Sequence, residues 1–279
     1  MAKQFFIYTN RHKDKGLAVT ERIRSYLEAR GQRVFLKTEG ADWTEAADCM
    51  IVLGGDGTML RAARETRELN IPIIGVNLGT LGYMTEIEPD HLEEALDRLI
   101  GGDYERESRM MLHGRAFFTE KGAEENRPEE DWALNDIVIT RRGPLQIIRF
   151  NIYVNGQFLN AYCADGMIVT TPTGSTGYNL SAGGPLVAPQ AKLIMLTPIC
   201  PHTLNQRSII LSPEDVIEIE IPKGGDGGEQ TVEASFDGGR GIPLCTGERI
   251  RIMQSRKVTE FIRLNRVSFL EVLHGKLSD

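Results

Sequence analysis

The feature that most constrains the fold is an apolar run that ends in three glycines around one aspartate. Ile51-Val-Leu-Gly-Gly-Asp-Gly-Thr-Met-Leu60 is typical of a buried strand that ends in a tight turn, and Thr58 opens a helical pattern. Glycine lets backbone N–H groups approach an anion closely, and a helix N-terminus adds partial positive charge. The turn therefore predicts a phosphate site. The predicted phosphate contacts are Gly54, Gly55, Gly57, Thr58 and Arg61.

Asp56 is unexpected in such a turn, because its carboxylate repels phosphate. A chain that keeps an acid there needs it as a base or to hold a cation. The turn is not a Walker loop, because no Gly-Lys-Ser/Thr follows, and it is not the G-x-G-x-x-G of common dinucleotide folds. The alternative is an ordinary strand-to-helix turn in which Asp56 helps to cap the helix.

The first hundred residues alternate between strand and helix patterns. Strands are predicted at 5–8, 34–37, 49–53 and 71–77, and helices at 17–30, from 58 onward and at 89–99. This alternation predicts an α/β N-terminal domain with a parallel sheet over residues 1–104. Ligands in such sheets bind beyond the carboxyl ends of the strands, which is where the glycine turn lies.

Strand patterns dominate after residue 105 and predict a β-rich, two-sheet domain over residues 105–265. Asn155-Gly156 predicts a tight hairpin, and Gly224–Gly228 is interpreted as the end of another. Residues 119–131 are acidic and predict an exposed loop. Residues 266–279 are expected to form a helix that packs back on the first domain. The predicted strands are 109–118, 133–140, 147–154, 166–171, 194–197, 208–211, 216–221, 232–236 and 249–253.

Composition indicates a soluble cytoplasmic protein. The formal charge of −7 offers no argument for a nucleic-acid partner, and no apolar run is long enough to span a membrane. The N-terminus lacks the pattern of a signal peptide. The four cysteines are scattered and predict reduced thiols, and no histidine or cysteine spacing predicts a structural metal.

Three further segments are candidates for ligand binding. Asn77–Tyr83 follows a predicted strand and offers an aromatic wall through Tyr83, although a plain loop is the alternative. Asn135-Asp136 pairs an amide with a carboxylate, which suits the hydroxyl groups of a ribose. Asp165–Pro185 contains a loop rich in hydroxyl groups and glycines, which suits a polar ligand with phosphates and an aromatic ring; a plain surface loop is the alternative.

Taken together, three motifs resemble bacterial NAD kinases in order and spacing, over nearly the whole chain. They are Gly54-Gly-Asp-Gly-Thr58, Asn135-Asp136 and Thr171-Pro-Thr-Gly-Ser-Thr-Gly-Tyr-Asn-Leu-Ser-Ala-Gly-Gly-Pro185. The resemblance implies transfer of a phosphoryl group from ATP, or from polyphosphate in some members, to the 2′-hydroxyl of the adenosine ribose of NAD. It also implies a homodimer or homotetramer. We expect Mg²⁺, or another divalent cation, to bridge the donor phosphates without a protein ligand.

The resemblance implies that Asp56 is the proton acceptor. Asp136 stands where the family usually has glutamate, which shortens the reach of the carboxylate by one methylene. The expected NAD contacts are Asp56, Gly57, Tyr83, Asn135, Asp136, Asp165, Thr173, Thr176, Gly177, Tyr178, Ser181 and Asp237.

Two other functions fit parts of the pattern. A lipid kinase shares the glycine turn, but it needs an apolar pocket or a membrane-docking patch, and the chain has no basic amphipathic helix. A non-catalytic sensor would bind NAD without needing Asp56. An assay for NADP formation separates these functions.

Overall fold

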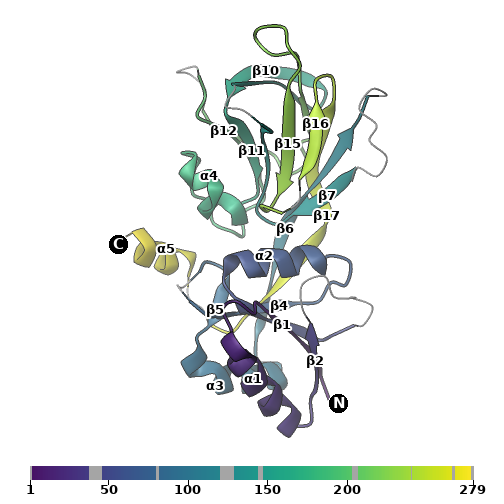
Figure 1. Ribbon diagram of the computed structural model, residues 1–279. Coiled ribbons are helices and arrows are strands. Elements are labelled where there is room, and N and C mark those ends of the chain that lie inside the picture. Colours follow the sequence, from purple (N-terminus) through teal and green to yellow (C-terminus); the bar gives the residue numbers. More distant parts are fainter. Residues whose placement is uncertain are drawn as a thin grey trace. The chain divides into compact units, whose positions relative to one another are not determined.

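The computed structural model describes residues 2–37, 46–79, 82–119, 129–143, 147–202, 207–239, 241–265 and 268–277. The chain divides into two compact units (Figure 1). The first consists of Met1–Arg109 and Lys257–Asp279, and the second of Met110–Arg256. No helix in the described ranges is long and apolar enough to cross a membrane.

The first unit is built on a parallel sheet, as predicted. Its strand order is β2-β1-β3-β4, with β5 beside β4, and every one of these pairs is parallel. Figure 1 shows α2 on one face of this sheet and α1 and α3 on the other. The strands are β1 (Gln4–Thr9), β2 (Arg33–Lys37), β3 (Cys49–Gly54), β4 (Ile73–Asn77) and β5 (Thr85–Ile87), and the helices are α1 (Ala18–Ala29), α2 (Asp56–Glu65) and α3 (Leu92–Gly101).

Burial explains why β3 is the clearest strand of the sequence. All six of its residues are buried, since helices cover both faces of the sheet and leave no polar side to the strand. On one face, Ile51 and Leu53 share a core with Ile23 of α1 and Leu96 of α3. On the other face, α2 buries Met59, Ala62 and Ala63.

Three details of the first unit differ from the sequence prediction. Helix α2 begins at Asp56 rather than Thr58, with Gly55 as its N-cap residue. The predicted helix at Pro89 is first a short 3₁₀ helix, η2 (Pro89–His91), which α3 follows. Strand β5 was not predicted, because three residues are too few for an alternating pattern to be recognised.

The second unit contains a six-stranded antiparallel sheet and an antiparallel group of strands from the 11-stranded mixed sheet, which confirms the β-rich, two-sheet prediction. One has the order β10-β9-β14-β17 and the other β13-β12-β11-β8-β15-β16. Both sheets contribute to one apolar core, for example Phe150 and Ile219 from the first and Val169 and Phe236 from the second. The strands are β8 (Asp136–Arg141), β9 (Ile148–Val154), β10 (Gln157–Ala164), β11 (Gly166–Thr170), β12 (Ile194–Ile199), β13 (Ile209–Leu211), β14 (Ile217–Glu220), β15 (Thr231–Phe236), β16 (Ile242–Cys245) and β17 (Arg249–Arg263).

Two predicted segments divide differently in the structure. The predicted strand 133–140 is split between β7 (Glu130–Ala133) and β8, which begins at Asp136. Of the predicted loop 119–131, residues 120–128 lie outside the described ranges, and Glu130 and Asp131 belong to β7. Strand β7 pairs with β6 (Glu105–Phe117), the strand predicted at 109–118.

Other strands were missed or shortened by the sequence analysis. Strand β10 was missed because it is an edge strand whose first five residues are exposed, so it lacks an alternating apolar pattern. Strand β16 was missed as well. Strand β17 extends ten residues beyond the predicted end at Met253, through the charged pair Arg256-Lys257.

One of the two hairpin predictions is confirmed and the other is wrong. Asn155-Gly156 joins the antiparallel strands β9 and β10, and both residues have positive φ, 51° and 78°. The segment Gly224–Gly228 instead connects β14 of one sheet to β15 of the other. A glycine-rich turn alone does not reveal whether the strands it joins are hydrogen-bonded partners.

The predicted C-terminal helix is present as α5 (Phe269–Leu277), which belongs to the first unit. Strands β6 and β17 each contribute residues to both units. The second half of β17 joins the parallel sheet of the first unit, where Phe261 pairs with Ile73 of β4.

The end of α3 provides a matched pair of glycines for a stability test. Gly101 is the last helical residue, whereas Gly102 follows it with φ 79° in the left-handed region. Gly102→Ala should destabilise the protein by about 1–2 kcal/mol, because a Cβ is strained in that conformation. Gly101→Ala should be neutral or stabilising by up to about 1 kcal/mol, since its added Cβ meets no atom within 4 Å. Denaturant unfolding of both variants measures the difference, and equal effects would contradict this explanation.

Candidate active site

The glycine turn forms an open amide cradle at the carboxyl end of β3. Gly55 is extended at φ −137°, and α2 starts directly after it. In the described part of the chain, the backbone N–H groups of Gly55, Asp56 and Gly57 donate to no acceptor, while the Gly55 carbonyl accepts from Thr58 and Met59. These free donors are the first amides of a helix, where the helix dipole also favours an anion.

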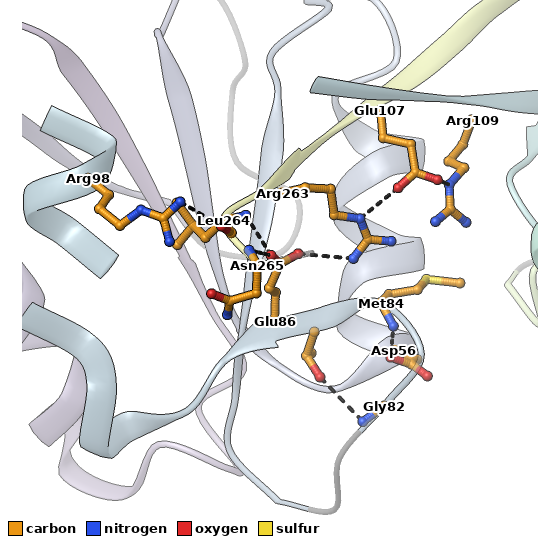
Figure 2. Close-up of polar contacts among 11 residues, drawn as sticks. Asp56, Gly82, Met84, Glu86, Arg98, Glu107, Arg109, Arg263, Leu264 and Asn265 are labelled. Carbon is orange, nitrogen blue, oxygen red and sulfur yellow. Dashed lines mark hydrogen bonds and ion pairs between the residues drawn. The ribbon is translucent and has the colours of Figure 1, made fainter. Parts of the chain in front are cut away.

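The Asp56 carboxylate is held by the chain segment that leads into β5. Oδ2 accepts the Tyr83 N–H at 2.8 Å, and Oδ1 accepts the Met84 N–H at 3.0 Å; Figure 2 shows the Met84 contact. A Cβ built on Gly82 would lie 2.0 Å from Oδ1, so only glycine permits this approach. The helix-cap alternative is not supported, because both Asp56 carboxylate oxygens bond to the amides of Tyr83 and Met84, outside the helix.

Tyr83 lies beside this carboxylate, and its predicted role as a ligand wall stays a prediction. Burial, and then the negative charge of Asp56, raise the pKa of the Tyr83 hydroxyl. The ammonium group of Lys276, on α5, lies 4.9 Å from the centre of the Tyr83 ring. The amide of Asn77 bonds within its own turn, to both the N–H and the carbonyl of Gly79. Thr80 and Leu81 of the same predicted segment lie outside the described ranges.

Lys13 is a candidate that the sequence analysis missed. Its Nζ would lie 2.9 Å from a Cβ on Gly55 and 3.6 Å from one on Gly79, so the ammonium group sits over the glycine turn. A turn anchored on the Asn10 carbonyl, which accepts the N–H groups of Lys13 and Asp14, places it there. The available signal was a basic run directly after β1, because the carboxyl ends of neighbouring parallel strands meet at one edge.

Helix α2 also carries two arginines that were considered as phosphate contacts. Arg61 is exposed and Arg64 is half-buried, both on the helix that the glycine turn opens. The predicted contact between Arg61 and phosphate stays a prediction.

In the second unit, Asn135 and Asp136 lie at the start of β8 and are fixed by Asp237. The Asp237 carboxylate accepts the N–H groups of Leu134, Asn135 and Asp136 at 2.8, 2.8 and 3.1 Å. Asp237 thus holds the backbone of this segment in place. Its expected contact with NAD stays a prediction. These bonds also explain why the predicted strand 133–140 is interrupted, since the amides turn toward Asp237 and leave the ladder.

The side chains of Asn135 and Asp136 both carry buried oxygen atoms in unusual polar environments. Asn135 Oδ1 is buried and has no hydrogen-bond partner in the described part of the chain. Asp136 is also buried, and burial, followed by the nearby charge of Asp237, raises the pKa of its carboxyl to about 7. Asn135 Oδ1 is a hydrogen-bond acceptor that the described residues leave unused, and the neighbouring Asp136 carboxyl is partly protonated near neutral pH. Together they are suited to a ligand with hydroxyl or amino groups.

The hydroxyl-rich loop packs directly on Asn135. Thr170 Oγ1 donates to the Asn135 carbonyl at 2.9 Å, and the Thr171 N–H donates to the same carbonyl at 2.8 Å. A Cβ on Gly174 would lie 2.6 Å from that carbonyl oxygen, so this glycine allows a close approach of two backbones. The loop continues as a 3₁₀ helix, η4 (Thr173–Thr176), and a single helical turn, α4 (Tyr178–Ser181).

Asn179, which the sequence analysis did not single out, anchors this turn. Its buried amide accepts from Thr197 Oγ1 at 2.8 Å and donates to the Pro185 carbonyl at 3.0 Å. Its neighbours remain accessible: Tyr178 is 46% exposed, and Ser181 is exposed as well. Of the other expected contacts, Thr173 is buried, Thr176 is half-buried, and Gly177 lies close to the Asn135 amide.

Asp165 is not brought to this cluster. It precedes β11, whereas Asp136 pairs with Thr170 at the other end of that strand. The backbone of Asp165 lies five residues along the strand from Thr170, which is roughly 17 Å. Arg141 binds the Asp165 carboxylate at 3.2 Å.

Among the described residues, no group of three or more histidine, cysteine or acidic side chains is arranged to hold a metal ion. Asp56 offers a single carboxylate beside the free amides of the glycine turn. Backbone N–H groups cannot ligate a cation, so the one carboxylate fits a Mg²⁺ ion that would be carried mainly by substrate phosphates and would need only one or two carboxylates from the protein.

Comparison with known proteins finds relatives over nearly the whole chain. Residues 6–104 match the model of the ATP-NAD kinase N-terminal domain, and residues 134–264 match that of the C-terminal domain. The chain is 46% identical to the NAD kinase of Lachnospira eligens, over 99% of this chain and 100% of that protein. It is 42% identical to the NAD kinase of Lachnoclostridium phytofermentans, over 99% of both chains.

Solved structures show the same fold. The NAD kinase from Archaeoglobus fulgidus, in complex with ATP, is 26% identical with a TM-score of 0.76, covering 99% of this chain and 98% of that chain. Yeast NADH kinase, complexed with NADH, is 24% identical with a TM-score of 0.83, covering 99% of this chain and 88% of that chain. Full-length similarity at this level, with matches to both domains, establishes that the chain belongs to the NAD kinase family, a family of phosphotransferases.

Proposed function

We propose that this chain transfers the terminal phosphoryl group of ATP to the 2′-hydroxyl of the adenosine ribose of NAD and so produces NADP. The observation that carries the proposal is the Asp56 carboxylate, clamped by two backbone amides at the start of a helix whose first N–H groups are free. Phosphoryl transfer to a hydroxyl uses a base that accepts the hydroxyl proton and a site that binds the donor phosphates. The Asp56 carboxylate and the amide cradle place both groups in the same turn.

The donor side is supported by the amides of Gly55, Asp56 and Gly57 and by Lys13. Free amides at a helix N-terminus bind phosphate oxygens, and the ammonium group adds a full positive charge beside them. The Archaeoglobus fulgidus relative was solved with ATP, which favours ATP as the donor. Polyphosphate is the second donor to be assayed, because the same amides are suited to either phosphate chain.

The acceptor side is supported by the remaining hydrogen-bonding capacity of Asp56. Each carboxylate oxygen accepts one N–H, which leaves a lone pair on each for a further donor. A ribose hydroxyl keeps its proton at neutral pH, so a positioned base that takes this proton as the bond to phosphorus forms accelerates the transfer. The two amide bonds determine which way the remaining lone pairs face.

In the second unit, the Asn135 cluster is suited to the adenosine part of NAD. The orphaned Asn135 Oδ1 accepts from a hydroxyl or amino group, and Asp136 either donates or accepts near neutral pH. The exposed ring of Tyr178 provides a surface for stacking a purine.

A divalent cation such as Mg²⁺, bound with ATP, would supply positive charge that offsets the repulsion between the donor phosphates and Asp56. The protein itself contributes three groups to binding of the donor phosphates and their cation: the amide cradle, Lys13 and the Asp56 carboxylate.

The family resemblance also leads us to propose a cytoplasmic homodimer or homotetramer. Light scattering coupled to size-exclusion chromatography measures the number of subunits directly.

Incubation of the purified protein with NAD, ATP and Mg²⁺, followed by enzymatic detection of NADP, tests the proposed reaction. Parallel incubations replace NAD with NADH or diacylglycerol and ATP with polyphosphate. Phosphorylation of diacylglycerol would indicate a lipid kinase, and NAD binding without any product would indicate a sensor.

Asp56→Asn should lower kcat by roughly 10²–10⁴-fold, the usual contribution of a positioned base, with little change in the affinity for NAD. Steady-state kinetics and NAD binding by calorimetry measure the two effects. Asp48→Asn is a matched control, because Asp48 also accepts a backbone N–H and lies at the opposite end of β3. Near-normal turnover of the Asp56 variant would refute its role as the base.

Lys13→Ala should raise the KM for ATP roughly ten-fold or more, because a charge-assisted hydrogen bond to phosphate is lost. The KM for NAD should change little. Lys15→Ala is the control, since Lys15 is also exposed and lies two residues further along the chain. If the two variants have the same KM for ATP, Lys13 does not contact the donor.

Asp136→Asn should stabilise the ligand-free protein increasingly as the pH rises. The wild-type carboxyl has a folded-state pKa of about 7, above its unfolded value near 4, so its protonated form is favoured by folding. This contribution is fully present below about pH 4 and is lost as the pH rises through about 7. The variant cannot ionise, so its Tm should exceed that of the wild type by more at pH 8 than at pH 5. A pH-independent difference would contradict the raised pKa.

A further inference from the structure

The direction of the Asp56 carboxylate depends on where β5 lies. The two amides that hold it, from Tyr83 and Met84, belong to the residues just before this strand. Strand β5 has only three residues, and its pairing with β4 is irregular between Gly75 and Val76. So short a ladder contributes few hydrogen bonds, and the position of β5 needs a second source of restraint.

Glu86, at the centre of β5, supplies that restraint. Its carboxylate accepts the N–H groups of Leu264 and Asn265 at 2.5 and 2.6 Å and binds Arg263 Nη1 at 3.0 Å. The Glu86 side chain is 8% exposed, so these bonds form largely out of water. Figure 2 shows Glu86 reaching from β5 to the end of β17, where all three donors lie.

Arg263 is fixed in turn by a second carboxylate. Its Nε donates to Glu107 Oε2 at 2.7 Å, and the other oxygen of Glu107 accepts from Arg109 Nε at 2.8 Å. Arg109 is 3% exposed. The resulting chain of ion pairs, Glu86–Arg263–Glu107–Arg109, links β5 to β17 and β6 (Figure 2).

We infer that Glu86 and Arg263 are positioning residues for Asp56, and that their ion pair holds β5 so that the Tyr83 and Met84 amides orient the reacting carboxylate. The inference rests on the proposed function, in which Asp56 is the base. Only Thr85 lies between Met84 and Glu86, so a shift of Glu86 moves these amides with it. A displacement of about 1 Å at a reacting group lowers turnover by on the order of 10²-fold.

Kinetics of Glu86 variants test the inference. Glu86→Ala should lower kcat by about 10–10²-fold, while KM for NAD and for ATP changes less than about three-fold. Glu86→Gln keeps an oxygen for the Leu264 and Asn265 amides but loses the charge that binds Arg263, so its loss should be smaller. This variant also keeps the test valid if Glu86→Ala does not fold. Normal kcat in Glu86→Gln and Glu86→Ala, or an increase in KM alone, would overturn the inference.

Glu93→Gln is the matched control. It removes the carboxylate of another ion pair of the first unit, the one between Arg22 of α1 and Glu93 of α3, which closes at 2.7 Å and does not involve β5. Its kcat should equal that of the wild type. A loss of kcat as large as that of Glu86→Gln would mean that any broken ion pair in this unit lowers turnover, which would refute the specific role.

A double-mutant cycle separates positioning from general damage. If Glu86 acts through Asp56, Glu86→Gln should change kcat less than about two-fold in an Asp56→Asn background, because the base that it positions is already absent. Losses that multiply would mean that Glu86 acts independently of Asp56 and would overturn the inference.

Hydrogen exchange gives a readout that does not depend on activity. Glu86→Gln should accelerate exchange of the Tyr83 and Met84 amides, while those of β3 stay protected. Unchanged protection of Tyr83 and Met84 would refute the link, whatever the kinetics show. If the wild-type protein forms no NADP, the proposed function fails, whereas NADP formation with no effect of Glu86→Gln refutes only this inference.

Discussion

The structure of the site depends on one constraint, the fixed direction of a carboxylate that belongs to a helix N-terminus. Asp56 cannot both cap its own helix and face a substrate, so its oxygens bond to the amides of Tyr83 and Met84 instead. This arrangement leaves the first amides of α2 free for an anion. The close approach is possible because Gly82 has no side chain.

The second unit uses the same physical device for a different purpose. The carboxylate of Asp237 accepts the N–H groups of three successive residues, Leu134, Asn135 and Asp136. These bonds fix the backbone from which the Asn135 and Asp136 side chains extend. Burial, and then the charge of Asp237, raise the pKa of the Asp136 carboxyl to about 7. In both units a carboxylate bonded to backbone amides sets the geometry. Each site also has a glycine that permits a close approach, Gly82 to the Asp56 carboxylate and Gly174 to the Asn135 carbonyl.

The sequence predicted the parts of this protein that depend on local pattern. The alternation of strands and helices identified the parallel sheet, because β3 and β4 are buried on both faces and read as apolar runs. The glycine turn and the hydroxyl-rich loop were recognisable from composition, and the structure places Asp56 and Asn135 in environments suited to chemistry. Strands β5 and β10 escaped prediction because one is too short and the other too exposed to carry a pattern.

What the sequence could not predict are contacts set by topology. Glu86 and Arg263 are separated by 177 residues, and they meet only because β17 returns to the sheet that β5 extends. Lys13 reaches the glycine turn because β1 lies beside β3, a neighbour relation that strand propensity alone does not determine. Asp237 was recognised by resemblance, whereas its bonds to the backbone amides of Leu134, Asn135 and Asp136 were not predicted. The Asp56 carboxylate is therefore a local feature of the sequence, whereas its orientation depends on the whole fold of the first unit.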